Sequence, residues 1–239
     1  MFVCLVGVAL LGRRARRYLP QDHLSADSKD AVKLAIGLVA TMTALLLGLL
    51  VSSAKGTYDT ARSEVIQMAG KVAFLDRVLA LYGPEAADAH AKFRDVAADA
   101  VPRIWAEESG QLAPNEQAGD AFYLAVEDLS PHNDTQRVLK TQLLTLLADL
   151  GQLRSLLQAQ SIPSISKPLL IALACWLVII FFGFSLVAPP NATTTLALIA
   201  SGFSVACAIF LILELDHPFS GPIQIPSEPM TRFLDHLAK

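Results

Sequence analysis

Two carboxylates stand at the end of a long apolar run and are the best placed residues of this sequence for chemistry. Glu214 and Asp216 follow about twenty apolar residues, and Pro218 comes two residues after Asp216. Ionisable groups at membrane depth are costly and usually face protein or a water-filled cavity. Because they are two positions apart, they cannot share a face of one helix. Pro218 is expected to end the helix near them, which would remove this constraint. They are candidates for lining an ion path or organising an oligomer; the alternative is ordinary charges that end a membrane span.

No other residues combine into a recognisable reaction centre. The five histidines are scattered, and no HExxH, Walker A loop, GxGxxG or GxSxG occurs. The three cysteines lie far apart in apolar runs, which is typical of buried small hydrophobes. Acidic pairs such as Asp76 and Asp88 are more simply read as solvated helix faces. We therefore expect no enzyme, no metal ligand and no cofactor.

The composition indicates a protein of the lipid bilayer. Hydrophobic residues make up 53% and charged residues only 17%, against about 25% charged residues in soluble domains. The net charge of −3 offers no basic excess, so nucleic acid is not an expected partner.

Membrane spans are predicted at both ends of the chain. A span needs about 20 apolar residues, and three uncharged runs satisfy this: 34–54, 168–188 and 192–213. Residues 1–12 are read as a short or truncated first span, stopped by the arginines that begin at Arg13. The predicted organisation is two spans in 1–54, a polar helical domain in 55–167, two spans in 168–216 and a tail in 217–239.

The second span carries small residues at every fourth position: Ala40, Ala44, Gly48 and Ser52. Such a ridge lets membrane helices approach closely, so helix packing is the preferred interpretation. The alternative is a pore-lining face.

That pore-lining alternative would use polar residues and a narrow apolar region of the same span. Thr41, Thr43 and Ser53 would help to line the face, and the leucines from Leu45 to Leu50 could gate it by dewetting. Lys33 and Lys55, at the two ends of the span, would attract anions. Glu214 and Asp216 would attract cations, so ion selectivity stays open.

The polar domain is predicted to be an antiparallel helical bundle, which makes the chain an all-α, polytopic membrane protein. Two heptad seams, spaced 3 and 4 residues apart, run through 58–82 and 139–157. Weaker amphipathic stretches at 85–108 and 115–129 lie between them, separated by Gly110 and Pro114. Pro163 follows the second seam. No strand-like alternation of useful length is present.

The run from Leu213 to Ile225, with its LELD-x-PF-x-G pattern, resembles the signature of the bestrophin-like family of integral membrane proteins. A second stretch, 75–85, agrees with it in order along the chain. The residues that carry the resemblance are Asp76, Arg77, Tyr82, Gly83, Pro84, Pro218, Phe219 and Gly221. One departure is Pro190, where the family is expected to have a basic residue.

The resemblance implies kinship to bestrophins, which are oligomeric anion channels. Two features of bestrophins are missing: no acidic calcium clasp follows Phe219, and the second span has no aromatic pore neck. The resemblance also implies a cytoplasmic helical domain. Six Lys/Arg in the 13–33 loop favour the opposite orientation by the positive-inside rule, and both orientations stay open.

The leading hypothesis is a homo-oligomeric, channel-like protein that passes inorganic ions across a bacterial inner (plasma) membrane. The alternative is a membrane sensor or scaffold whose bundle binds a ligand or partner without conduction.

Overall fold

The structure, a computed structural model, describes residues 1–16, 18, 26–105, 116–160, 165–189, 191–228, 230 and 231. These residues form seven α-helices and one 3-10 helix, with no strand among them, which confirms the all-α prediction. The chain divides into two compact units, Met1–Gly56 with Ser164–Asp216 and Thr57–Pro163 with His217–Lys239. The predicted breaks at Gly110, Pro114 and Pro163, the position Pro190 and the tail residues 232–239 lie outside the described residues.

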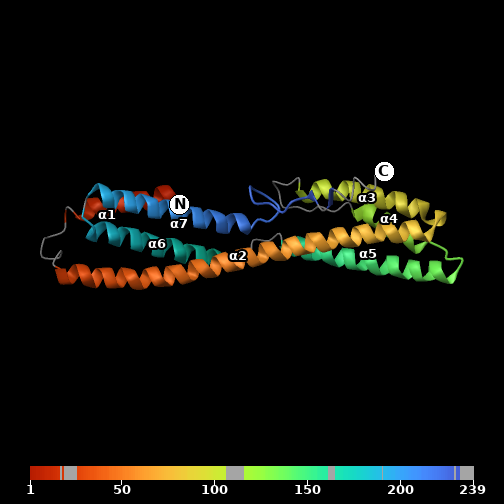
Figure 1. Cartoon of the computed structure of the whole chain (residues 1–239), viewed down its shortest axis with the longest axis horizontal. Coiled ribbons are helices and arrows are strands. Elements are labelled where there is room, and N and C mark those ends of the chain that lie inside the picture. The colour runs from red at the N-terminus through yellow and green to blue at the C-terminus, as the bar shows by residue number, and fades with distance from the viewer. Residues whose placement is uncertain are drawn as a thin grey trace. The chain divides into compact units, whose positions relative to one another are not determined.

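The first unit is the membrane unit. It contains α1 (Phe2–Arg16), the first part of α2 (Ala26–Tyr82), α6 (Lys167–Val187) and α7 (Ala192–Leu215). By length and composition α2, α6 and α7 can each cross a membrane. The 15 residues of α1 extend about 22 Å and pack along α6 and α7 (Figure 1). Leu5, Leu50, Leu173, Phe181 and Ile212 belong to the core that these four helices share.

Glycines set the closest helix contacts of this unit. A Cβ on Gly12 of α1 would lie 2.7 Å from Ser185 Cβ on α6, and a Cβ on Gly183 would lie 2.7 Å from Ile36 Cδ1 on α2. Small residues allow such approaches where the surrounding solvent is as apolar as the side chains. These two glycines allow the closest of these contacts, whereas Gly48 of the predicted ridge has nothing within 4 Å of its Cβ position.

The end of α1 is tied to the end of α6, and α7 begins with a capping box. The Arg16 guanidinium donates to the Ala188 carbonyl, a group left without a helical partner at the end of α6. Asn191 Oδ1 accepts from Thr194 N at 2.8 Å, and Thr194 Oγ1 accepts from Asn191 N at 3.4 Å. These contacts fix where the two spans α6 and α7 turn back on each other.

The second unit is the predicted helical bundle. The second part of α2 is followed by η2 (Pro84–Ala86), α3 (Ala87–Trp105), α4 (Glu116–Glu127) and α5 (Asp134–Gln160). Both heptad seams are buried or half-buried, and Leu75, Leu79, Leu143 and Leu146 meet in one core. Apolar residues with a mean spacing of 3.5 form a stripe along one face of a helix, and this face packs against neighbouring helices. The spacing in the sequence therefore predicted these two helices.

The segment after α7 also folds onto this unit. Ile225 and Met230 are buried among residues of α2 and α5, including Ala61, Val65 and Leu157. The segment has no periodic apolar pattern, so the sequence identified it only as a tail.

Candidate functional site

The face of α2 that carries the small-residue ridge is left uncovered by the described part of the chain. Thr41, Ala44, Gly48 and Ser52 are exposed, and Ala40 is half-buried. The other side of the same helix is buried at Ile36, Thr43, Leu50 and Ala54. The partner of the ridge is therefore not another described helix of this chain.

Two exposed leucines lie between hydroxyl side chains along that uncovered face. Leu45 is 72% exposed and Leu49 is 61% exposed, between Thr41 and Ser52. The Thr41 hydroxyl donates to the Gly37 carbonyl at 2.9 Å, so it still offers its oxygen as an acceptor to a passing group. Thr43, another residue predicted for this lining, is buried and donates to the Val39 carbonyl at 2.7 Å.

The two lysines flank the apolar part of this helix. Lys33 and Lys55 are both exposed. Lys33 Nζ lies 2.8 Å from Asp30 Oδ1, and both side chains are open to solvent. Such an exposed pair contributes little to stability, so the charges at this end remain available to ions in solution.

Glu214 and Asp216 are not brought together. The helix α7 runs to Leu215, and Asp216 keeps a right-handed helical backbone as its C-cap, with its N–H 3.2 Å from the Ile212 carbonyl. Residues two apart on a helix point to different sides. Asp216 is accordingly buried, at 5% exposure, whereas Glu214 is half-buried.

The signature residues of the 75–85 stretch build the corner between α2 and α3. Asp76 Oδ1 lies 2.5 Å from His90 Nε2 across that corner. Gly83 has φ of 111°, a conformation that favours glycine, and Pro84 opens η2. Arg77 is exposed on α2.

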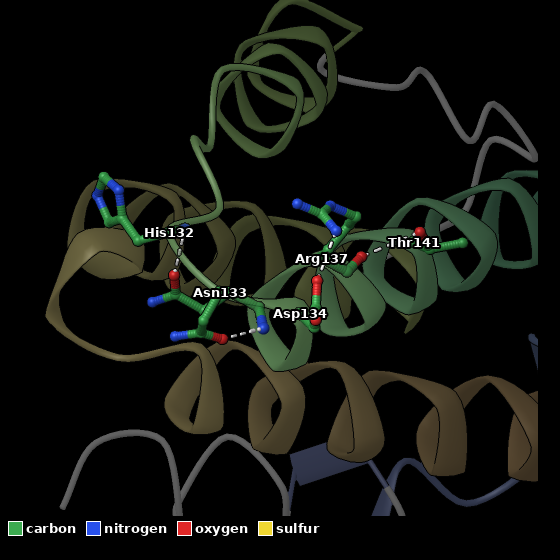
Figure 2. Close-up of polar contacts among 6 residues, drawn as sticks. His132, Asn133, Asp134, Arg137 and Thr141 are labelled. Atoms are coloured by element: carbon green, nitrogen blue, oxygen red, sulfur yellow. Dashed lines mark hydrogen bonds and ion pairs between the residues drawn. The ribbon is translucent and has the colours of Figure 1, made fainter.

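A glutamine that the sequence analysis missed joins this corner to α5. Gln136 Nε2 donates to the Tyr82 carbonyl at 3.1 Å, and its Oε1 accepts from His132 N at 2.8 Å. Gln136 N in turn donates to Asn133 Oδ1 at 2.8 Å, which caps α5 (Figure 2). The spacing of Asn133 and Gln136, three residues apart before an apolar run, is a capping signature that could have located the start of α5, but not the bond to Tyr82.

The side chain of Tyr82 is buried at the same corner without a hydrogen-bond partner for its hydroxyl among the described residues. Burial raises the pKa of the Tyr82 phenol above its ordinary value of 10.0, and the neighbouring Glu85 carboxylate raises this pKa further. The phenol therefore stays protonated at any physiological pH.

The bundle carries one open groove of about 550 Å³ next to this corner. Its walls come from η2, α3, α4 and the turn after α4, and include Glu85, Asp88, Lys92, Leu124, Asp128 and His132. Lys92 Nζ lies 2.6 Å from Asp88 Oδ2, which leaves the groove with a net negative charge. Within the described ranges, no three His, Cys, Asp or Glu side chains are grouped to hold a metal ion.

The second signature stretch forms the turn after α7. Pro218 is buried and its carbonyl accepts from Ile225 N at 2.8 Å, while Gly221 has φ of 85°. Phe219 packs against the α2 and α5 core. The residues by which the sequence is recognised are thus mainly residues that shape the bundle unit.

Comparison with known proteins agrees with this fold. The family model described as Bestrophin-like domain matches residues 3–230. Two crystal structures, each of a single-substitution variant of a bacterial bestrophin homologue from Klebsiella pneumoniae, are similar in fold. The first has a TM-score of 0.71 at 14% identity and covers 100% of this chain and 98% of that chain. The second has a TM-score of 0.67 at 17% identity, with 99% and 95% covered. The curated proteins include no match.

Proposed function

This chain belongs to the bestrophin-like family of membrane proteins, and from that membership we propose that it forms an ion-conducting path built by several copies of itself. The observation that carries the proposal is the uncovered face of α2. A membrane helix with exposed small and hydroxyl side chains gains little from lipid, whereas a second helix can pack closely against the small ones. Copies arranged around an axis would provide that second helix.

Within such an assembly, two adjoining strips of α2 take different roles. Ala40, Ala44 and Gly48 pack against the next copy, and Thr41, Leu45 and Ser52 line the path at heptad spacing. A ring of Leu45 and Leu49 side chains forms an apolar constriction, which excludes water and ions when narrow. The exposure of Leu45 and Leu49 supports this assignment.

The charged residues act at the ends of the path. Lys33 and Lys55 raise the local concentration of anions beside the two ends of the apolar strip. Glu214, half-buried, contributes negative charge near the end of α7, and Asp216, buried at the helix C-cap, organises the turn that follows. The bacterial source of the two similar structures supports placement in a bacterial inner membrane.

The experiment is ion flux after reconstitution. Liposomes with the purified protein are compared with empty liposomes for chloride and for potassium efflux, and the mass of the assembly is measured in parallel. We expect protein-dependent flux and an oligomer of this chain alone. A monomer, or liposomes no leakier than the empty ones at any pH or calcium level tested, would refute the proposal.

A second candidate function is a sensor or scaffold without conduction, and the groove of the bundle favours it. The groove has the volume of a small-molecule site, and Glu85, Asp88 and Asp128 would select a ligand with a positive charge. A cationic compound that stabilises the protein, and loses this effect in Asp128→Asn, would support this function, particularly if no flux is found.

A further inference from the structure

A shallow groove between α1 and α7 has apolar walls and one cation. Its volume is about 40 Å³. The lining residues are Val6, Ala9, Leu10 and Arg13 from α1, and Thr195, Leu198 and Ile199 from α7. The two sets follow helical spacings of 3 and 4, so each belongs to one face of its helix. Phe2 and Phe203, whose ring centroids are 6.2 Å apart, continue the same contact towards the other end of α1.

We propose that this groove binds one anionic phospholipid, with part of an acyl chain along the apolar walls and the phosphate at Arg13. The volume admits a few methylene groups but not a headgroup, so the headgroup must lie at the polar end. That end is marked by Arg13, in the last turn of α1. A basic residue between membrane helices is the usual partner of an anionic headgroup.

The polar groups around the groove leave Arg13 as the group that meets the phosphate. Arg13 is half-buried and makes no hydrogen bond or ion pair with any residue that the structure describes. The neighbouring Arg16 is already committed to the Ala188 carbonyl. The Thr195 hydroxyl donates to the Asn191 carbonyl at 2.8 Å, so it does not supply a donor.

The charge around this end favours an anionic partner. Six Lys/Arg stand between residues 13 and 33 against three Asp. Of these acids, Asp30 is paired with Lys33. Arginines in the last turn also complement the dipole of α1, but that effect does not require an apolar groove beside one of them.

Lipid, rather than another protein chain, is the expected occupant of the walls. Leu10 is 58% exposed and Ile199 and Phe203 are also exposed, so the groove opens to the outside of the unit. The two apolar runs 168–188 and 192–213 contain no acidic residue that a second copy could bring against Arg13. An anionic phospholipid supplies both the apolar chain and the charge in one molecule.

The test is a titration of the purified full-length protein with dioctanoyl-phosphatidylglycerol and dioctanoyl-phosphatidylcholine, followed by native mass spectrometry. Both lipids carry the phosphate, but the quaternary ammonium of phosphatidylcholine offsets its negative charge beside Arg13, so we expect the wild type to prefer the anionic lipid by about tenfold. Arg13→Gln should abolish this preference, and Arg13→Lys should retain part of it. Arg14→Gln is the matched control, because Arg14 has the same charge in the same helical turn but does not line the groove.

A second variant tests the apolar part. Ala9→Leu fills the groove and should weaken both lipids while leaving Arg13 in place. The proposal is wrong if Arg13→Gln and Arg14→Gln reduce the preference equally, since that would indicate diffuse attraction. Unchanged lipid binding in Ala9→Leu would also refute it. A change of subunit number in Arg13→Gln with unchanged lipid binding would assign the groove to a second copy instead.

Discussion

Gly83 ends α2 in a conformation that side chains with a Cβ rarely adopt, and it does so at the corner where Tyr82 and Gln136 connect α2 to α5. The sequence could identify Gly83 and Pro84 as the end of a helix, because both residues interrupt helical hydrogen bonding. It could not identify Gln136 as the residue that takes up the Tyr82 carbonyl. That contact joins positions 54 residues apart and depends on how the two helices pack.

Gly83→Ala should destabilise the bundle unit by about 1–3 kcal/mol, the cost of this backbone region for a residue with a Cβ. The new Cβ would also lie 2.9 Å from Glu85 Oε2. Gly70→Ala is the control: Gly70 is an exposed helical residue with nothing within 4 Å, and alanine there should stabilise by about 1 kcal/mol. Thermal unfolding followed by circular dichroism measures both. Equal shifts of the two variants would contradict the assigned role of Gly83.

Tyr82→Phe should raise stability at neutral pH by about 1 kcal/mol, because it removes a buried hydroxyl that has no hydrogen-bond partner among the described residues. The raised pKa of Tyr82 also predicts a pH effect. Above pH 10 the unfolded chain releases the phenol proton while the folded chain retains it. Proton release from Tyr82 therefore has no effect on the free energy of unfolding well below pH 10, and it lowers this free energy as the pH rises above 10. The unfolding temperature of wild type should therefore fall below that of Tyr82→Phe increasingly from pH 9 to 11. Parallel curves would contradict this.

Helices with a periodic apolar face could be predicted from the sequence. Contacts made by a single glycine or by residues of an irregular turn could not. The seams of α2 and α5 are regular over about five turns or more, so their buried positions follow from spacing alone. The close approach of α1 to α6 depends on Gly12, which has no side chain to contribute to a pattern. The packing of Ile225 on α2 and α5 comes from an aperiodic turn after α7 and was missed for the same reason.

The packing of α1 against α6 predicts a position-specific cost for alanine in α1. Gly12→Ala places a Cβ 2.7 Å from Ser185 Cβ and 3.0 Å from the Phe182 carbonyl oxygen, and neither can move without shifting α6. We expect a loss of about 1–3 kcal/mol. Gly7→Ala, in the same helix with nothing within 4 Å, should be neutral or slightly stabilising. The unfolding temperatures in detergent compare the two, and a Gly7→Ala loss as large as that of Gly12→Ala would argue against this packing.

A single copy of the chain leaves the small and polar strip of α2 without a partner among its described helices. Spacing identified Ala40, Ala44 and Gly48 as a ridge, but a ridge does not reveal whether its partner comes from the same chain. The other side of α2, at Ile36, Leu50 and Ala54, is already occupied by α1, α6 and α7. We propose that a ring of copies covers this surface and forms the ion path.

The most direct test of that path is the chloride and potassium efflux of liposomes that contain Leu45→Ser, compared with Leu196→Ser and wild type. Leu45 on α2 is 72% exposed and Leu196 on α7 is 69% exposed. Both substitutions therefore introduce the same hydroxyl at an exposed position of a membrane helix. A path lined by α2 predicts at least severalfold faster efflux for Leu45→Ser, because a polar ring keeps the constriction wet, and no change for Leu196→Ser. Equal effects of the two substitutions, or efflux from none of the three proteins, would contradict a conducting path along α2.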